Sequence, residues 1–197
     1  MFWFLHYATK AALGLALLGL AALLYLHRHW FEPADAWVET LRRTRTETVP
    51  VLGQTTGIVV RLPTGDSVAL RTANATVETY RLNGIVAPPW SRNPLSERAR
   101  TFRRTRDALA SLVLSNEVRI AYTFHVPGRG GSGSLYRDGT NIALPLLREG
   151  HVIVHQPSLH AVPVLDQVQL LAAEKAARDA ARGVWSDPNT LAALRDP

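Results

Sequence analysis

The N-terminal end of the chain carries a long apolar run, which limits what this part can become. From Ala11 to Leu26 there is no charged or strongly polar side chain, and Phe2 to Tyr7 add aromatic residues before it. Counted from Phe2, the stretch can cross a bilayer core of roughly 30 Å at about 1.5 Å of rise per residue. We therefore expect residues 1–30 to be an anchor with its flanks, in which residues 2–26 contact the lipid bilayer as a single membrane-spanning helix.

A cleaved signal peptide is the alternative interpretation, because the run lies at the extreme N-terminus. The residues that follow, His27 to Pro33, offer no pair of small side chains for a peptidase. This favours an uncleaved anchor. Basic residues lie on both sides of the run. The positive-inside bias therefore favours a cytoplasmic or matrix location for the residues after the run, but it does not determine it.

Composition predicts one globular domain after the anchor. The chain has 197 residues, of which 47% are hydrophobic, enough for one core but not for a second full domain. The absence of cysteine excludes disulfides, thiolate zinc sites and cysteine nucleophiles. The net charge of +6 comes almost wholly from arginine, which suits nucleic acid, anionic lipid or acidic protein partners. A GC-rich genome would leave the same arginine content.

The order of local patterns predicts a mixed α and β domain. Residues 31–53 read as a linker with a short helix, and Pro63 to Asp66 form a turn between two β-rich runs, as in a hairpin. A helix is expected from Asn93 to about Ser115, with Asn93 as its cap. The remaining expected elements are further strands at 77–85, 118–124, 134–136 and 151–154, and helices at 141–148 and 164–182, with a glycine-rich stretch at 128–133.

The expected helix at 93–115 has a basic face. Arg100, Arg103 and Arg104 fall on its exposed side, together with Asp107. These arginines are a candidate docking surface for phosphate or acidic protein. An ordinary solvated helix face would show the same pattern.

Seven short motifs occur in the order of one known family. They are listed here as they stand: Gly57-Ile58-Val59-Val60 with Thr64-Gly65-Asp66-Ser67, the strand Tyr80 to Pro89, Ser96 to Arg100, Pro127-Gly128-Arg129, Leu135 to Asn141, Leu146 to Gly150, and Ala177-Arg178 with Arg182 to Trp185. Between Thr56 and Trp185 the chain thus resembles the staphylococcal nuclease-like domain. The resemblance implies an α+β fold in which a five-stranded OB-type β-barrel is capped by helices, over residues 54–188, followed by a C-terminal tail at 189–197.

The resemblance also implies a site, which this sequence keeps only in part. Active members of the family bind calcium through carboxylates, use a glutamate to assist the attacking water, and stabilise the phosphate with two arginines. Asp66 and Arg81 match one carboxylate and one arginine position, and Arg129 is the candidate for the second arginine. Val86 replaces a metal-binding aspartate and Pro89 replaces the glutamate. Neither side chain can bind calcium or accept a proton, so we expect no metal, no cofactor and no active catalytic residue.

These observations predict a membrane-anchored pseudonuclease. We expect it to be an accessory subunit of a membrane complex, such as a mitochondrial respiratory-chain complex, and to contact other subunits there. The mitochondrial inner membrane is the favoured location by analogy with other anchored nuclease-like domains. The alternatives are a membrane-tethered nucleic-acid-binding protein and a calcium-dependent nuclease with residual activity.

Overall fold

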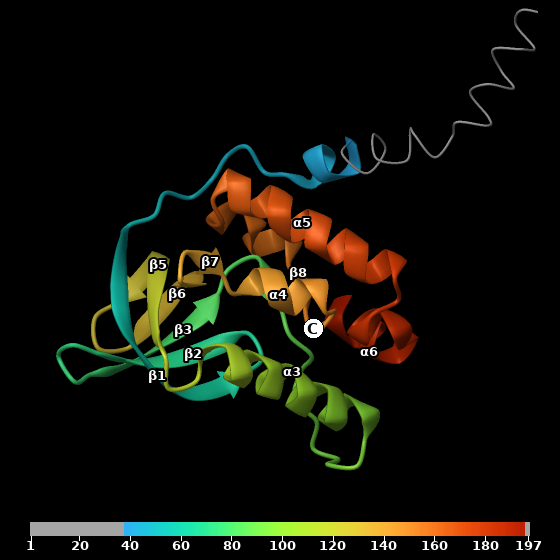
Figure 1. Ribbon diagram of the computed structural model, residues 1–197, viewed down its shortest axis with the longest axis horizontal. Coiled ribbons are helices and arrows are strands. Elements are labelled where there is room, and N and C mark those ends of the chain that lie inside the picture. The colour runs from blue at the N-terminus through green and yellow to red at the C-terminus, as the bar shows by residue number, and fades with distance from the viewer. Residues whose placement is uncertain (1–37, 196–197) are drawn as a thin grey trace, which may run out of the picture. The chain divides into compact units, whose positions relative to one another are not determined.

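The computed structural model describes residues 38–195, and Figure 1 shows their arrangement. The membrane span expected at residues 2–26 lies outside this range. Within residues 38–195, no helix is both long enough and apolar enough to cross a bilayer. The chain divides into two units, Met1–Arg42 and Arg43–Pro197, and the folded domain belongs to the second. Residues 38–43 are helical, which accounts for part of the helix expected within 31–53.

The centre of the domain is a closed five-stranded barrel. Its strands are β1 (Gly53–Thr64), β2 (Ser67–Thr72), β3 (Val77–Leu82), β5 (Glu117–Val126) and β6 (Gly130–Arg137). They follow the order β3-β2-β1-β5-β6, and a parallel pairing of β3 with β6 closes the ring. The predicted α+β class and five-stranded OB-type barrel are confirmed.

The remaining elements surround this barrel. Strand β7 (Thr140–Asn141) pairs with β6, while β4 (Ile85–Val86) and β8 (Ile153–Val154) form a separate two-stranded sheet. The helices are α3 (Glu97–Val113), α4 (Ala143–Arg148), η1 (Gln156–Ala161), α5 (Val164–Asp179), η2 (Gly183–Ser186) and α6 (Pro188–Arg195). Helix α3 packs against β1, and α5 packs against α4 (Figure 1).

Barrel closure depends on the glycine-rich segment at the start of β6. A Cβ atom on Gly130, whose φ is 105°, would lie 2.0 Å from the Thr79 carbonyl oxygen, and one on Gly131 would lie 1.9 Å from the Phe124 oxygen. No other residue allows the backbones to approach so closely. The expected strand start at Ser134 was wrong, because the glycines of this segment lie in close contact with the neighbouring strands and do not form a loop.

The main core fills the barrel and the layer beneath its helices. Glu78, Tyr80 and Leu82 are buried at alternate positions of β3, as expected for a strand with one face inside a barrel. Tyr80 is completely buried, and its hydroxyl donates a hydrogen bond to Glu78 Oε2 at 2.7 Å. Leu109 of α3 and Leu171 of α5 belong to the same apolar cluster. Each such leucine contributes roughly 1.5–3 kcal/mol by burial.

The N-cap of helix α3 lies three residues after the expected cap. The Ser96 side chain accepts the Ala99 N–H at 3.1 Å and is the N-cap, so the assignment of Asn93 to this role was wrong. Asn93 instead accepts the Leu95 N–H through Oδ1 at 3.0 Å. Both residues are good caps, and the local hydrogen bond at Asn93 shapes the preceding loop.

A strap, residues 43–50, holds the N-terminal end of the domain against α5. Arg43 Nη2 forms an ion pair with Glu174 Oε2 at 2.7 Å, and the Glu174 side chain is only 3% exposed. Gln167 Oε1 accepts the Arg45 N–H at 2.7 Å. The Val49 N–H donates to the His160 carbonyl oxygen at 2.8 Å. The domain therefore begins with an ordered segment before its first strand.

The C-terminal segment is also structured. Residues expected to form a tail at 189–197 contribute most of helix α6. Leu194 of this helix joins Val86, Ile153 and Val184 in a second apolar cluster, separate from the main core. Helix α6 thereby covers the short β4–β8 sheet.

Candidate functional site

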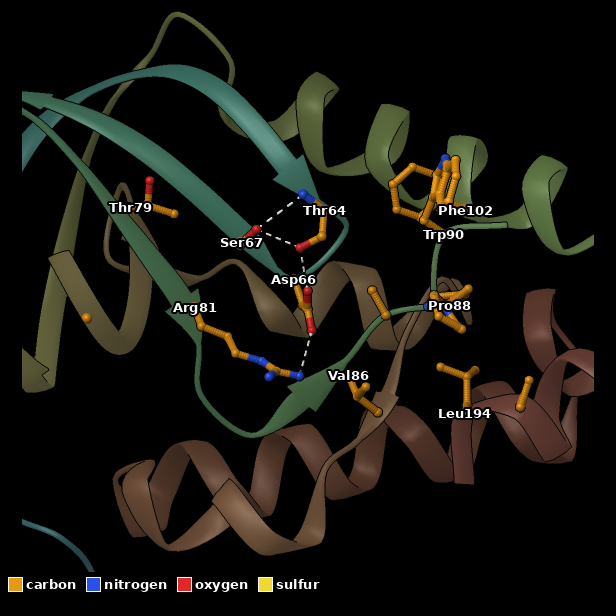
Figure 2. A pocket seen from close by; sticks show the side chains of 14 residues that line it. Thr64, Asp66, Ser67, Thr79, Arg81, Val86, Pro88, Trp90, Phe102 and Leu194 are labelled. Atoms are coloured by element: carbon orange, nitrogen blue, oxygen red, sulfur yellow. Dashed lines mark hydrogen bonds and ion pairs between the residues drawn. The ribbon is translucent and has the colours of Figure 1, made fainter. Parts of the chain in front are cut away.

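The largest feature near the predicted site residues is a cavity of about 510 Å³, here called the Asp66 pocket (Figure 2). It lies where the β1–β2 turn, β3, β4, α3 and α6 meet. Its lining residues are Thr64, Asp66, Ser67, Thr79, Arg81, Val86, Ala87, Pro88, Pro89, Trp90, Phe102, Gly131, Ala193 and Leu194. The pocket has a polar wall and an apolar wall.

The polar wall is a network of short-range hydrogen bonds around the β1–β2 turn. Thr64 Oγ1 donates to Asp66 Oδ1 at 2.6 Å, and it also lies 2.6 Å from Ser67 Oγ. The Ser67 hydroxyl accepts the Thr64 N–H at 3.1 Å (Figure 2). The Asp66 carbonyl oxygen accepts the Leu82 N–H at 2.8 Å. Asp66 therefore stabilises the turn and ties it to the end of β3.

Arg81 reaches the same carboxylate from β3. Its Nη2 lies 3.5 Å from Asp66 Oδ2, and its side chain is 64% exposed, against 10% for Asp66. One end of the guanidinium is thus held while the rest faces solvent. The structure brings together Asp66 and Arg81, the two site positions retained from the family pattern.

His155 follows β8 and lies within electrostatic range of this ion pair. Burial and the nearby Arg81 guanidinium lower the pKa of the imidazole, while Asp66 opposes them. Its Nδ1 lies 2.8 Å from Ser158 Oγ. The ring is therefore neutral at neutral pH, so Arg81 supplies the positive charge at this end of the pocket.

The apolar wall comes from β4, the loop after it, α3 and α6. Val86 is buried and pairs with Ile153 in the β4–β8 sheet. Pro88 and Leu194 complete this side, and Trp90 and Phe102 lie at its outer end (Figure 2). Val86 is thus part of an apolar cluster that includes Leu194 of the C-terminal helix.

The donor atoms of the Asp66 pocket do not fit a calcium ion. Calcium takes about six to eight oxygen ligands, several of them carboxylates. Asp66 is the one carboxylate among the lining residues, and both its oxygens already interact with Thr64 and Arg81. Within residues 38–195, no group of three acidic, histidine or cysteine side chains is placed to hold a metal ion. Val86 and Pro89 supply no oxygen from their side chains.

Arg129 is not among the residues that line the pocket. It is exposed in the turn between β5 and β6, where its carbonyl oxygen accepts the Thr79 N–H at 2.9 Å. Gly131 is the β6 residue that reaches the pocket edge. The role of second phosphate-binding arginine therefore stays a prediction for Arg129.

The predicted docking arginines separate into two groups. Arg100 and Arg104 both pair with Glu97, at 2.5 Å and 3.8 Å respectively. Arg103 instead donates to the Pro94 carbonyl oxygen at 3.1 Å and lines a different cavity beside Trp90. All three are exposed as expected, but they do not form one surface with free charge.

The sequence analysis missed the contributions of Trp90, His155 and Leu194. Trp90 follows the Pro88-Pro89 pair, a position at which an exposed aromatic residue is informative. The apolar residues of 191–194 were a usable signal for a docked helix. His155 had no such signal, because only the β4–β8 pairing brings it near Arg81.

Comparison with known proteins supports the fold. No protein-family model matches the sequence. A staphylococcal nuclease domain-containing protein of Schizosaccharomyces pombe is 26% identical over 139 residues, which cover 66% of this chain and 15% of that protein. This distant similarity and the closed barrel fit a staphylococcal nuclease-like, OB-type fold.

Proposed function

We propose that this chain is a catalytically inactive nuclease-like protein that serves as an accessory, protein-binding subunit of a membrane complex. The observation that carries the proposal is the position of Val86. It lies in the wall of the Asp66 pocket, buried in one cluster with Leu194 of α6. A metal-binding carboxylate in its place would be buried among apolar side chains, at a cost of several kcal/mol.

The side chains that line the Asp66 pocket support the proposed loss of phosphodiester hydrolysis. Hydrolysis of a phosphodiester needs charge stabilisation of the transition state and a base for the attacking water. Arg81 can still contact a phosphate through its exposed side. Pro89 offers no base, and Asp66 is already bound by Thr64 and Arg81. Each missing group costs on the order of 10² to 10⁴ in rate.

Membrane attachment through residues 2–26 is part of the proposal. It is supported by the length of the apolar run. We propose the mitochondrial inner membrane as the location and other membrane-complex subunits as the partners.

A nuclease assay tests the inactive state. The full chain in detergent is incubated with single-stranded DNA and millimolar calcium, beside an Asp66→Ala variant prepared in the same way. We expect equal, background-level cleavage from both proteins. Cleavage that requires Asp66 would overturn the proposal in favour of a residual nuclease.

Extraction in mild detergent followed by native electrophoresis tests the accessory role. We expect the chain to migrate with a much larger assembly. Migration as a free monomer would contradict this part of the proposal, whatever the nuclease assay shows.

Binding of nucleic acid without cleavage is the second candidate, and the exposed Arg81 and Trp90 favour it. Phe124 of β5 is also exposed, at 58%, but two other candidate rings offer little support. Tyr80 is fully buried, and the Tyr136 hydroxyl donates to Asp166 Oδ2 at 2.6 Å. Sequence-tolerant binding usually needs successive exposed rings for base stacking. Salt-sensitive binding of an oligonucleotide that weakens on charge reversal at Arg100 and Arg103 would favour this candidate.

A further inference from the structure

A second, smaller cavity adjoins the outer end of the Asp66 pocket and is here called the arginine cleft. It measures about 260 Å³, and its lining residues are Trp90, Ser91, Arg92, Pro94, Ala99, Phe102, Arg103 and Arg106. Trp90 and Phe102 line both cavities. The two cavities therefore share an aromatic wall, which Figure 2 shows from the side of the Asp66 pocket.

The arginine cleft carries positive charge that the protein itself does not neutralise. Three of its lining residues are arginines and none is acidic. Arg103 donates to a carbonyl oxygen, and the Arg106 guanidinium lies over the Phe102 ring at 6.0 Å from its centroid. Arg92 has no hydrogen bond or ion pair within the part of the chain that the structure describes. The nearby carboxylate of Glu97 is already paired with Arg100 and Arg104.

Large apolar side chains are exposed beside these charges. Trp90 is 63% exposed and Leu95 is 83% exposed. Both lie in the loop between β4 and α3, on either side of Arg92. Exposed tryptophan and arginine together are typical of binding hot spots, since each combines a large contact area with hydrogen-bonding capacity.

We infer that the arginine cleft binds an acidic segment of a partner protein, in which a carboxylate lies next to a bulky apolar residue. The carboxylate would be gripped by Arg92 and Arg103, and the apolar side chain would pack against Trp90. The inference rests on the proposed protein-binding function and names the chemistry of the partner.

The dimensions and chemistry of the cleft favour a peptide over the other anionic partners. Its volume is below the roughly 300 Å³ at which small-molecule pockets usually begin, which suits one anchoring side chain. Phe102 is buried, so Trp90 is the one exposed ring in the lining, and a single ring is a poor platform for a nucleic-acid strand. Peripheral binding to an anionic bilayer uses a wide apolar helix face beside the basic residues, whereas Trp90 is the one exposed ring in this lining.

The test uses the full chain in non-ionic detergent and a fluorescein-labelled twelve-residue peptide of repeated Asp-Leu-Glu-Phe units. Binding is followed by fluorescence anisotropy. We expect Arg92→Glu with Arg103→Glu to weaken binding at least tenfold, and Trp90→Ala to weaken it severalfold. The matched control, Arg71→Glu with Arg129→Glu, changes the net charge equally at two exposed arginines that do not line the cleft, and it should alter binding less than twofold.

Several outcomes would overturn the inference. One is equal weakening by the control pair, which would mean that only net charge matters. Another is stronger competition by a thymidine oligonucleotide, or by micelles containing phosphatidylserine, than by unlabelled peptide. A third outcome is that the peptide does not bind, although the chain is inactive as a nuclease and migrates with a large complex. This result would overturn the cleft assignment alone. The proposed function would then stand.

Discussion

The polar wall of the Asp66 pocket is held by residues close in sequence, whereas the apolar wall is assembled from distant segments. Thr64, Asp66 and Ser67 bond to one another within a single turn. Val86 and Leu194 meet only because α6 returns to the β4–β8 sheet. The polar wall can therefore form from one local turn, while the apolar wall depends on a partner from the far end of the chain.

The largest expected effect comes from restoring the family's aspartate. Val86→Asp would place a carboxylate against Leu194 and Ile153 and should lower the free energy of unfolding by about 3 kcal/mol. Urea denaturation followed by circular dichroism measures this. Val86→Thr, which has nearly the same shape, should cost about 1 kcal/mol. Equal stability of the two variants would show that α6 does not depend on an apolar residue here.

Shortening the helix side of the same contact should have the next largest effect. Leu194→Ala removes buried methyl groups and leaves a cavity, so we expect a loss of about 2 kcal/mol and faster amide exchange in α6. Hydrogen exchange measured by mass spectrometry would detect both changes. The exposed Ala192 on the same helix provides the control, since Ala192→Ser should change stability by less than about 0.5 kcal/mol. Unchanged exchange in Leu194→Ala would contradict the docking of α6.

The polar wall should tolerate substitution better. Asp66→Ala removes the hydrogen bond from Thr64 and should cost about 1 kcal/mol. Arg81→Ala should cost less than about 1 kcal/mol, because a largely exposed ion pair contributes little. A double-mutant cycle on urea denaturation measures their coupling. A coupling energy well above that of an exposed ion pair would contradict this expectation, because the Asp66–Arg81 pair would then contribute substantially to stability.

The smallest effect is a pH dependence carried by His151 and His155. Burial lowers the pKa of both imidazoles below the ordinary value of 6.5, so the unfolded chain binds protons more readily than the folded one. Their contribution to stability is therefore complete above that value and is lost as the pH falls below it. Urea midpoints at about pH 7.5 and about pH 5.5 should differ in this direction. His155→Asn should reduce the difference between the two urea midpoints. An unchanged difference would mean that other groups cause the pH dependence.

Much of the barrel could be predicted from the sequence, because it depends on local periodicity and turn chemistry. The hairpin around Asp66 follows from alternating apolar residues and turn residues, and helix α5 follows from an alanine-rich pattern. The start of β6 could not be predicted in this way. Glycine favours loops in isolation, and only the opposing backbones of Thr79 and Phe124 show why it is needed in a strand.

The sequence could predict which residues belong to the candidate site, but not how their side chains are arranged. The replacements at Val86 and Pro89 are visible in the sequence alone. The sequence could not show that Arg129 is not among the residues lining the pocket, or that Glu97 pairs with both Arg100 and Arg104. Side-chain pairing depends on rotamers: Arg100 and Arg104 turn toward Glu97, whereas Arg103 turns back to the Pro94 carbonyl oxygen.

The sequence by itself determined which chemistry is present: an apolar N-terminal run, a chain without cysteine, an aspartate at position 66 and an arginine at position 81, and side chains without oxygen at Val86 and Pro89. Residue type and order are sufficient for these statements. Only the tertiary structure decided that Val86 packs with α6, that His155 lies near Arg81, and that Trp90 divides the Asp66 pocket from a cleft of arginines. These features join residues far apart in the chain, and such contacts are set by packing and barrel closure, which no local pattern contains.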